Sequence, residues 1–400
     1  MLLNFSLDKD TFKNDFLYKK PYLFKNAIDF NFSWKDVNEL YSRGDISHRD
    51  FKLMNGYEIP KNEYVESYDN LGVTEYRCIT SVLYEYLRNG ATLVRNRIKN
   101  EPFVDQISKQ IGNFAEARTL TGSYAAFSSK SSYKSHWDTR DVYAVQLLGR
   151  KRWILRKPNF EFPLYMQQTK SFPDIKEPEE IYMDVILEAG DILYIPRGWW
   201  HDPLPLNEET FHLAVATFAP TGFEYMRWLQ NIMPSILDCR KNFTNFENDA
   251  EMINNLSHQV AEIIKDKNCY QSFMMYHLAE QSVPSILSLD VLGNGKISQL
   301  NSTQKLYLNA NLLHYFDEGF VVINGNKINV DDISLNLIQY LFENPYSSVK
   351  NILDHFKEYS SEKISKLLFQ LAVALLHKDL KVKTSHIYSN LSDNSGMWSA

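Results

Sequence analysis

Hydrophobic and polar residues follow two different periods along this chain. Between residues 121 and 220, short runs rich in aromatic and β-branched residues are interrupted by Gly, Pro and Asp. Such runs predict the strands of an antiparallel sandwich or barrel. The runs are YAAFSS, VYAVQLLG, RWILRK, YMDVILEAGDILYIP and FHLAVATFA.

On either side of this region, apolar residues recur at helical spacing, which predicts amphipathic helices. ITSVLYEYLRNG (79–90) and PFVDQISKQIGNF (102–114) precede the strand-rich region. EYMRWLQNIMPSIL (224–237) and DAEMINNLSHQVAEIIKD (249–266) follow it. The middle of the chain is therefore expected to be a β-domain with helical segments before and after it.

The last hundred residues predict a separate small module. FVVINGNKINV reads as a hairpin that turns at Asn324 and Gly325, because Asn-Gly favours a tight two-residue connection. SLNLIQYLFENP, SVKNILDHFKEY and SEKISKLLFQLAVALLHKDL then predict three amphipathic helices. A hairpin beside three helices is typical of a winged-helix module.

Charge and cysteine content narrow the class of protein. The formal net charge is −6, and the residues from 301 onward carry nine lysines, no arginine and ten acidic residues. DNA-binding modules usually have a basic surface, so we expect no direct DNA binding and favour protein contacts for this module. Cys78, Cys239 and Cys269 are odd in number and far apart, which suits reduced thiols. No run is long and apolar enough to span a membrane, so we expect a cytoplasmic protein.

Two short patterns place metal-binding side chains at predicted strand ends. His136 and Asp138 stand two positions apart, and side chains with this spacing share one face of a strand. An HxD pair alone is weak evidence and favours an ordinary polar strand end. His201, however, ends the apolar run GDILYIPRGWWH. If the two strands are neighbours, two histidines and one carboxylate meet, which is the facial triad of non-haem Fe(II) oxygenases.

With these residues in place, the order HWD, GRKRW, EAGDILYIPRGWWH and FHLAVATF resembles the JmjC-type, cupin-fold 2-oxoglutarate oxygenases. The ribosomal oxygenase branch, which hydroxylates side chains of ribosomal proteins, is the most similar. The resemblance implies an α+β protein with a double-stranded β-helix, the JmjC/cupin barrel. Its oxygenase domain would span 1–220, with the barrel core at about 121–220. A helical dimerisation segment at 221–300, a winged-helix-like domain at 301–385 and a tail at 386–400 would follow.

The resemblance also assigns the co-substrates and their ligands. It implies that His136, Asp138 and His201 bind Fe(II), with 2-oxoglutarate and O2 as co-substrates. Lys151 stands fifteen residues after His136, where this branch has a basic residue for the distal carboxylate of 2-oxoglutarate. Strand alternation permits this role, because Lys151 would face inward while its two arginine neighbours face outward. Tyr124, twelve residues before His136, matches the position of a second hydrogen-bond donor to that carboxylate.

The chain departs from the branch at two positions. Gly122 stands where the branch often has Asn, and Ala214 stands where it often has Thr or Ser, so the lining is expected to be less polar. Four further residues are candidates for the substrate cleft: Arg140, Trp199, Trp200 and His212. Trp199 and Trp200 would wall the cavity, and His212 is also compatible with a hydrogen-bonded strand histidine. Arg140 and its neighbour Asp141 are also compatible with a surface pair.

The leading hypothesis is a homodimeric dioxygenase that hydroxylates a protein side chain, with a ribosomal protein as the favoured substrate. One alternative keeps the chemistry but has a biosynthetic peptide as substrate, with the winged helix binding that peptide. A second alternative, from another class, is a metal-binding cupin that acts as a sensor or scaffold without catalysis. A winged-helix transcription factor is the reading that the charge of the C-terminal region argues against.

Overall fold

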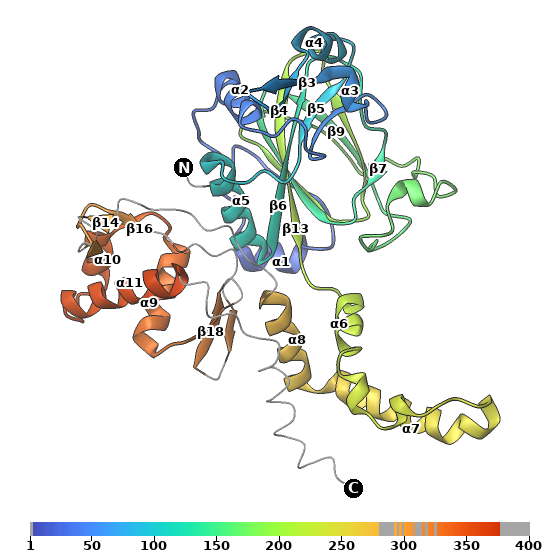
Figure 1. Cartoon of the computed structure of the whole chain (residues 1–400), viewed down its shortest axis with the longest axis vertical. Helices are drawn as coiled ribbons and strands as arrows, with labels where there is room; N and C mark the ends of the chain where they lie inside the picture. Colours follow the sequence, from blue (N-terminus) through green and yellow to red (C-terminus); the bar gives the residue numbers. More distant parts are fainter. Residues whose placement is uncertain are drawn as a thin grey trace. The chain divides into compact units, whose positions relative to one another are not determined.

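The computed structural model of the chain describes residues 3–279, 292–293, 296–297, 300–306, 308, 314–316, 319–323 and 326–376. The chain divides into two compact units, Met1–Phe218 and Ala219–Ala400 (Figure 1). Each unit has its own hydrophobic clusters. Within the described residues, no helix is both long enough and apolar enough to cross a membrane.

Two antiparallel sheets form the first unit. The seven-stranded sheet has the order β1-β11-β8-β13-β6-β5-β2, and the four-stranded sheet has the order β10-β9-β12-β7. The strands of the large sheet are β1 (Tyr22–Phe24), β2 (Phe51–Met54), β5 (Thr92–Arg95), β6 (Arg118–Ala126), β8 (Asp141–Leu148), β11 (Ile192–Ile195) and β13 (Thr210–Phe218). Those of the small sheet are β7 (His136–Trp137), β9 (Lys151–Arg156), β10 (Met183–Leu187) and β12 (Trp200–Pro205).

The two sheets pack face to face around an apolar cluster. Ala144 and Leu193 from the large sheet meet Trp153, Leu155 and Leu187 from the small sheet, and all five are buried. Side chains alternate between the two faces of each strand, so every second residue of these strands points into the space between the sheets. The result is the α+β barrel architecture that the strand-rich region predicts.

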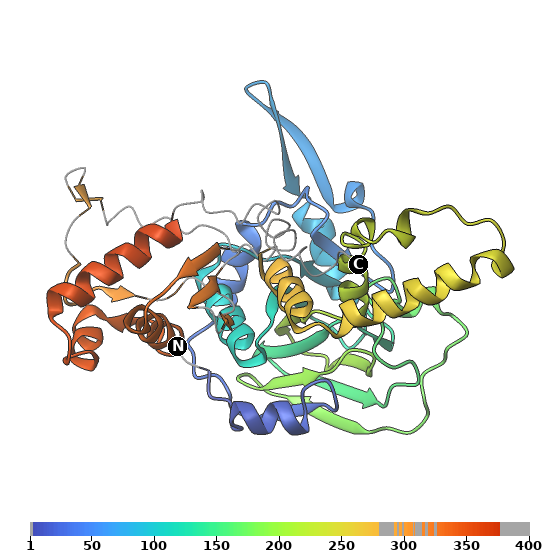
Figure 2. The ribbon, with the colours of Figure 1, turned by 90° about the horizontal axis from the view of Figure 1, so that it is seen from below.

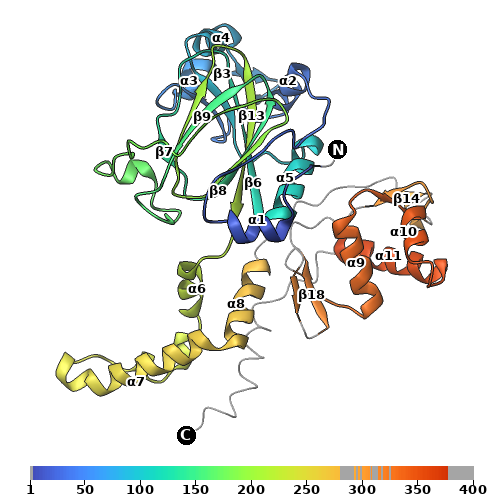
Figure 3. The ribbon, with the colours of Figure 1, turned by 180° about the vertical axis from the view of Figure 1, so that it is seen from behind.

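Helices cover the other face of the large sheet (Figure 3). Outward residues of β13, such as Phe211 and Leu213, share a core with Phe12, Leu40 and Ile107 from three of these helices. The helices and the remaining strands of this unit are α1 (Lys9–Asp15), α2 (Trp34–Ser42), α3 (Lys61–Tyr64), α4 (Thr80–Arg88), α5 (Pro102–Ala115), the 3-10 turn η1 (Thr169–Ser171), and the pair β3 (Val65–Asn70) and β4 (Val73–Cys78). Figure 2 shows the β3–β4 hairpin as a light-blue arm that projects from this unit.

Three strands of the large sheet lie before residue 121, where the sequence pattern predicts helices and loops. β1, β2 and β5 are only three or four residues long. β1 pairs with β11, which lies far along the chain. Such short strands carry no local period, because pairing to a distant strand rather than their own sequence stabilises them.

A two-residue corner connects the sheets beside the site. β8 ends at Leu148 in the large sheet, and β9 begins at Lys151 in the small sheet. Gly149 has φ +63°, and a Cβ at this position would lie 2.0 Å from the backbone oxygen of Glu209. Only glycine fits this corner, which fixes the face on which Lys151 enters β9.

The second unit begins with helices. They are α6 (Gly222–Leu229), the 3-10 turns η2 (Met233–Ser235) and η3 (Asp238–Arg240), α7 (Phe246–Lys265) and α8 (Lys267–Ala279). Trp228, Leu229, Cys269 and Phe273 form their small core.

The C-terminal part of this unit has its own core of buried side chains, including Val321, Leu337, Ile352 and Ile364. Its elements are β14 (Leu292–Gly293), β15 (Lys296–Ile297), β16 (Lys305–Leu306), β17 (His314–Phe316), β18 (Phe320–Ile323), β19 (Asn326–Asn329), α9 (Asp332–Glu343), β20 (Ser347–Ser348), α10 (Val349–His355) and α11 (Ser361–Leu376). Strands β18 and β19 pair as an antiparallel hairpin. The turn expected at Asn324 and Gly325, and the tail at 386–400, lie outside the described residues.

Candidate metal centre

Neighbouring strands bring the two sequence patterns together. β7 pairs with β12 in a register that sets His136 opposite His201 and Trp137 opposite Trp200. Asp138 follows β7 directly, and its backbone oxygen accepts a 3.0 Å hydrogen bond from the backbone N–H of Gly198. The two strand ends are therefore joined on both sides of the candidate ligands.

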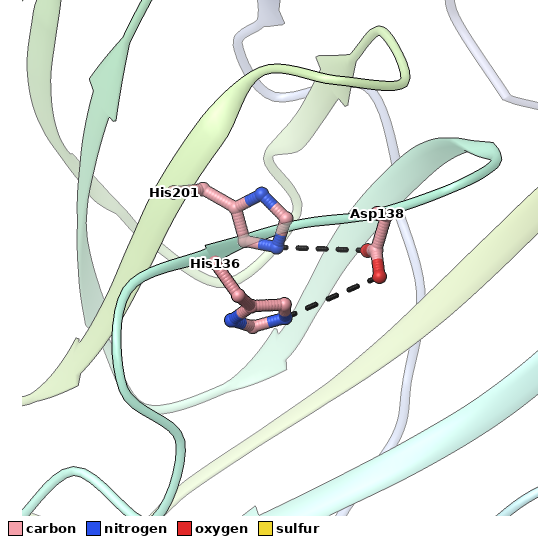
Figure 4. Close-up of side chains that lie close together, drawn as sticks. All are labelled: His136, Asp138 and His201. Carbon is pink, nitrogen blue, oxygen red and sulfur yellow. Dashed lines mark ion pairs between the residues drawn. The ribbon is translucent and has the colours of Figure 1, made fainter. Parts of the chain in front are cut away.

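The three side chains converge on one point (Figure 4). Nε2 of His136 lies 4.0 Å from Oδ1 of Asp138, and Nε2 of His201 lies 3.5 Å from Oδ2 of the same carboxylate. One ligand atom from each residue lies within 4.8 Å of the others. A single ion with bonds of about 2 Å can bridge such a set after small side-chain movements.

Backbone carbonyls hold both imidazoles in the orientation that metal binding requires. Nδ1 of His136 lies 2.7 Å from the oxygen of Lys134, and Nδ1 of His201 lies 3.1 Å from the oxygen of Trp199. In a neutral imidazole the Nδ1–H donates to such an oxygen, which leaves the Nε2 lone pair for a metal. Burial lowers the pKa of His201 to about 4, so this ring is neutral at physiological pH. Two imidazole nitrogens and a carboxylate suit a divalent transition metal such as Fe(II).

Lys151 is a buried lysine that makes no salt bridge with any described residue, although the charge of Asp202 acts on its ammonium from a distance. Its side chain faces the space between the sheets, as strand alternation predicts, and only 4% of the residue is exposed. Arg150 and Arg152 instead face outward and pair with Glu208 and Asp184. No hydrogen bond or salt bridge joins the Lys151 ammonium to any described residue. Burial lowers the pKa of Lys151 to about 7, because desolvation disfavours the charged form.

Tyr124 and His212 lie side by side near Lys151. They face each other across the β6–β13 pair, and their rings stack with centroids 5.0 Å apart. His212 is buried, but Nδ1 has no hydrogen-bond partner among the described residues. The described residues therefore provide no hydrogen bond to this nitrogen, and the role of His212 stays a prediction. Burial and the nearby charge of Lys151 lower the pKa of His212 well below its usual value, so its ring is neutral.

The other predicted cleft residues occupy different places. Trp199 belongs to the apolar cluster between the sheets. Trp200 lies on the opposite face of β12 from His201, where it stacks edge-on against Trp137 and donates a hydrogen bond to Asn159. Consecutive strand residues point to opposite faces, so Trp200 does not wall the cavity as expected. The guanidinium of Arg140 lies 4.8 Å from the ring centroid of Phe218.

One residue near the site, Tyr133, was not found by sequence reasoning, and the surface pair considered for Asp141 is not observed. The ring centroid of Tyr133 lies 5.9 Å from that of Tyr124 and 6.2 Å from that of His136, although Tyr133 stands in a loop without a motif. Asp141 is buried rather than part of a surface pair with Arg140, and it accepts hydrogen bonds from the N–H of Arg197 and the hydroxyl of Tyr194. It begins β8, in which every residue before Leu148 is buried.

Comparisons with known proteins agree with this arrangement. A family model described as the JmjC domain matches residues 93–225, a range that includes every candidate ligand. Ribosomal oxygenase 1 of Danio rerio is 25% identical over 255 residues, which cover 58% of this chain and 42% of that protein. The bifunctional lysine-specific demethylase and histidyl-hydroxylase NO66 of Drosophila mojavensis is 24% identical over 164 residues, which cover 40% of this chain and 18% of that protein. The chain thus spans less than half the length of either curated relative.

Solved structures support the fold over nearly the whole chain. A crystal structure of the Escherichia coli ribosomal oxygenase YcfD superposes with a TM-score of 0.56 at 16% identity, covering 94% of this chain and 98% of that one. A structure of YcfD in complex with cobalt and 2-oxoglutarate gives a TM-score of 0.54 at 16% identity, covering 93% and 97%. Residues 93–225 thus match the JmjC domain model, and this range contains the three converging side chains.

Proposed function

We propose that this chain is an Fe(II)- and 2-oxoglutarate-dependent dioxygenase that hydroxylates an amino-acid side chain in a ribosomal protein. One observation carries the proposal: His136, Asp138 and His201 converge inside the same barrel that buries Lys151 without a salt bridge to any described residue. A metal-binding scaffold without catalysis has no need for a buried lysine, whose charged form is costly without a salt-bridge partner.

In this proposal, His136, Asp138 and His201 hold the metal through Nε2, a carboxylate oxygen and Nε2. When bound, iron couples the decarboxylation of 2-oxoglutarate to succinate and CO2 with insertion of one oxygen atom of O2 into a C–H bond. Asp138 is the most exposed of the three, with 43% of its side chain accessible, whereas 4% of the His201 side chain is accessible. The substrate therefore approaches from the side of Asp138.

Lys151 supplies the positive charge for the far end of 2-oxoglutarate. On β12, His201 pairs with Leu155 of β9 and Pro205 pairs with Lys151, so the Lys151 backbone lies four residues from the metal centre. This separation is about 13 Å along a strand, which a lysine side chain and a five-carbon diacid span together. The hydroxyl of Tyr124 is proposed as a second donor to the same carboxylate. The complex of YcfD with cobalt and 2-oxoglutarate supports this use of the fold.

The names of the relatives support the substrate class. Ribosomal oxygenase 1 and YcfD are both described as ribosomal oxygenases, and NO66 is described as a histidyl-hydroxylase. Histidine is therefore the first side chain to inspect in the ribosomal proteins of cells that make this chain. A cytoplasmic location is compatible with the three free cysteines and stays a prediction.

The second unit is proposed to provide a dimerisation segment at 221–300 and a winged-helix-like domain at 301–385. In α7, Ile253, Leu256, Val260 and Ile264 recur at helical spacing but are only partly buried. Phe243 and Phe246, just before and at the start of this helix, are mostly exposed. Such a helix face favours coverage by a second copy. The hairpin β18–β19 and the core shared by α9, α10 and α11 support the winged-helix assignment.

Mass spectrometry of ribosomal proteins tests the proposed function. Cells with the intact gene are compared with cells carrying His136→Ala, and cells carrying His258→Ala serve as a control because His258 is exposed on α7. The expected result is a ribosomal peptide that gains the mass of one oxygen atom in the wild type and the control but not in His136→Ala. Identical ribosomal proteins in all three strains would refute the assignment and would favour a biosynthetic peptide or a scaffold role.

A further inference from the structure

The side chain of Asn96 fills the space above Gly122. Asn96 is the first residue after β5, and Gly122 lies on the adjacent strand β6. A Cβ at Gly122 would lie 2.8 Å from Oδ1 of Asn96, but at ordinary distances of 3.6 and 3.7 Å from the backbone oxygen of Arg95 and from Cα of Asn96. The Asn96 amide therefore occupies the volume that any side chain at position 122 needs.

This volume lies on the inner face of the barrel. On β6, Ser123 donates to the hydroxyl of Tyr41 and Thr121 donates to the hydroxyl of Ser108, both on the helix-covered side. Tyr124 stacks on His212 on the other side. Because strand residues alternate between faces, Gly122 shares the inner face with Tyr124. The Asn96 amide reaches this inner face from the end of the neighbouring strand.

The row of the large sheet at Gly122 offers no polar side chain of its own. Ala214 on β13 pairs with Gly122 on one side and with Ala144 of β8 on the other. The Asn96 amide makes no hydrogen bond with any described residue. Asn96 is half-buried and also lines a surface pocket of about 350 Å³ with Asp50 and Arg97. Its amide is thus reachable from solvent and lacks a partner.

The metal centre is close to this row. Tyr124 is two residues from Gly122 on the same face, which is about 7 Å along a strand. The ring centroid of Tyr133 lies 5.9 Å from that of Tyr124 and 6.2 Å from that of His136. Burial raises the pKa of Tyr124, and the negative charge of Asp138 adds to this shift, so Tyr124 interacts electrostatically with a candidate metal ligand. Gly122, with the Asn96 amide above it, therefore shares the inner face of the barrel with Tyr124, which Tyr133 connects to His136.

We propose that Asn96 contacts the substrate directly, and that Gly122 is required to leave room for its amide. The inference rests on the proposed function. A side-chain amide has two N–H donors and one oxygen acceptor, the same groups that a peptide bond presents. Asn96 is therefore suited to hydrogen-bond the backbone of the polypeptide segment whose side chain is hydroxylated. Gly122, Ala214 and Ala144 have no polar side-chain atoms. Asn96, which follows the adjacent strand β5, supplies the polar contact that this row lacks.

Gly122→Ala and Asn96→Ala separate this role from a packing role. The backbone at Gly122 is not left-handed, and the only close approach of an alanine Cβ is to the rotatable end of Asn96. Gly122→Ala should therefore fold normally and displace the Asn96 amide without removing it. Ser123→Ala is the matched control, because Ser123 is the neighbouring residue on the opposite face of β6.

The assay uses total ribosomal protein from His136→Ala cells as the substrate. Both variants are expected to lower kcat/KM for hydroxylation about three- to tenfold, the effect of losing one neutral hydrogen bond. The double variant should be no worse than either single variant, since both changes remove the same contact. Succinate formed per hydroxylated residue should rise, while the affinity for 2-oxoglutarate with Co(II), followed by tryptophan fluorescence, should stay within about twofold.

The outcomes separate the two claims. Hydroxylation and coupling within twofold of wild type in both variants would overturn the role of Asn96. A normal Gly122→Ala beside an impaired Asn96→Ala would overturn the clearance role of Gly122. If the wild-type protein hydroxylates no ribosomal protein, the proposed function fails and this inference fails with it.

Discussion

Replacing Lys151 with methionine is expected to make the ligand-free protein more stable. The ammonium is buried, faces the barrel interior and makes no hydrogen bond or salt bridge with any described residue, although the charge of Asp202 partly favours its charged form. Methionine is similar in length and needs no counter-ion, so it fills the same space without the desolvation cost. The gain should disappear when 2-oxoglutarate provides the missing negative charge.

The size of the effect and its pH dependence follow from the lysine pKa. This pKa falls from 10.5 to about 7 in the folded protein. Each pKa unit corresponds to about 1.4 kcal/mol, so the charged ammonium costs up to about 5 kcal/mol at pH 7 and below. Between pH 7 and about 10 the folded protein is neutral at this site while the unfolded chain is still protonated, so wild-type stability rises with pH. The advantage of Lys151→Met is therefore largest near pH 6 and fades toward pH 10.

Urea unfolding of wild type and Lys151→Met at pH 6 and pH 9 measures this difference. Arg152→Met is the matched control, because it removes an exposed cation from the same strand. Adding 2-oxoglutarate with Co(II) should stabilise the wild type and leave Lys151→Met nearly unchanged. A Lys151→Met protein that is no more stable than wild type at pH 6 would refute the reasoning, as would an advantage that does not shrink at pH 9.

Three other changes give distinct expected results. Burial raises the pKa of Asp141 to about 6, so ionisation of this carboxyl group destabilises the fold as pH rises from about 4 to 6. In urea unfolding, the stability of Asp141→Asn relative to wild type should therefore increase by up to about 3 kcal/mol between pH 4 and pH 7. A stability difference that does not change with pH would contradict this. Gly149→Ala should cost about 2 kcal/mol or more, because the corner has no room for a Cβ; a thermal midpoint equal to that of wild type would show that the corner can adjust. His136→Ala should weaken Co(II) binding about a hundredfold or more in a spectroscopic titration, and unchanged affinity would remove this residue from the metal site.

The parts of the site that depend on local spacing could be predicted from the sequence. Alternation along β9 is enough to turn Lys151 inward between two outward arginines. The spacing of His136 and Asp138 is likewise local, and the long apolar run before His201 marks a buried strand. These features need only the period of one strand.

Features that depend on distant pairing could not be predicted. β1 and β5 are too short to show a period, and their partners are chosen by tertiary packing. Tyr133 reaches the metal centre from a loop without a motif. The space above Gly122 is filled by Asn96, which no spacing rule places there. Sequence reasoning identified Gly122 as a departure from the family pattern but could not show which residue occupies the vacated space.

The central claim is that this chain inserts an oxygen atom from O2 into a ribosomal protein. The most direct measurement incubates the purified protein with Fe(II), 2-oxoglutarate, isotopically labelled O2 and ribosomal proteins from His136→Ala cells, and then locates the label by mass spectrometry. The account predicts one labelled oxygen on a single ribosomal side chain, succinate in matching amount, and neither product with the His136→Ala protein. Succinate without label in any ribosomal protein would contradict the substrate, and the absence of both products would contradict the chemistry.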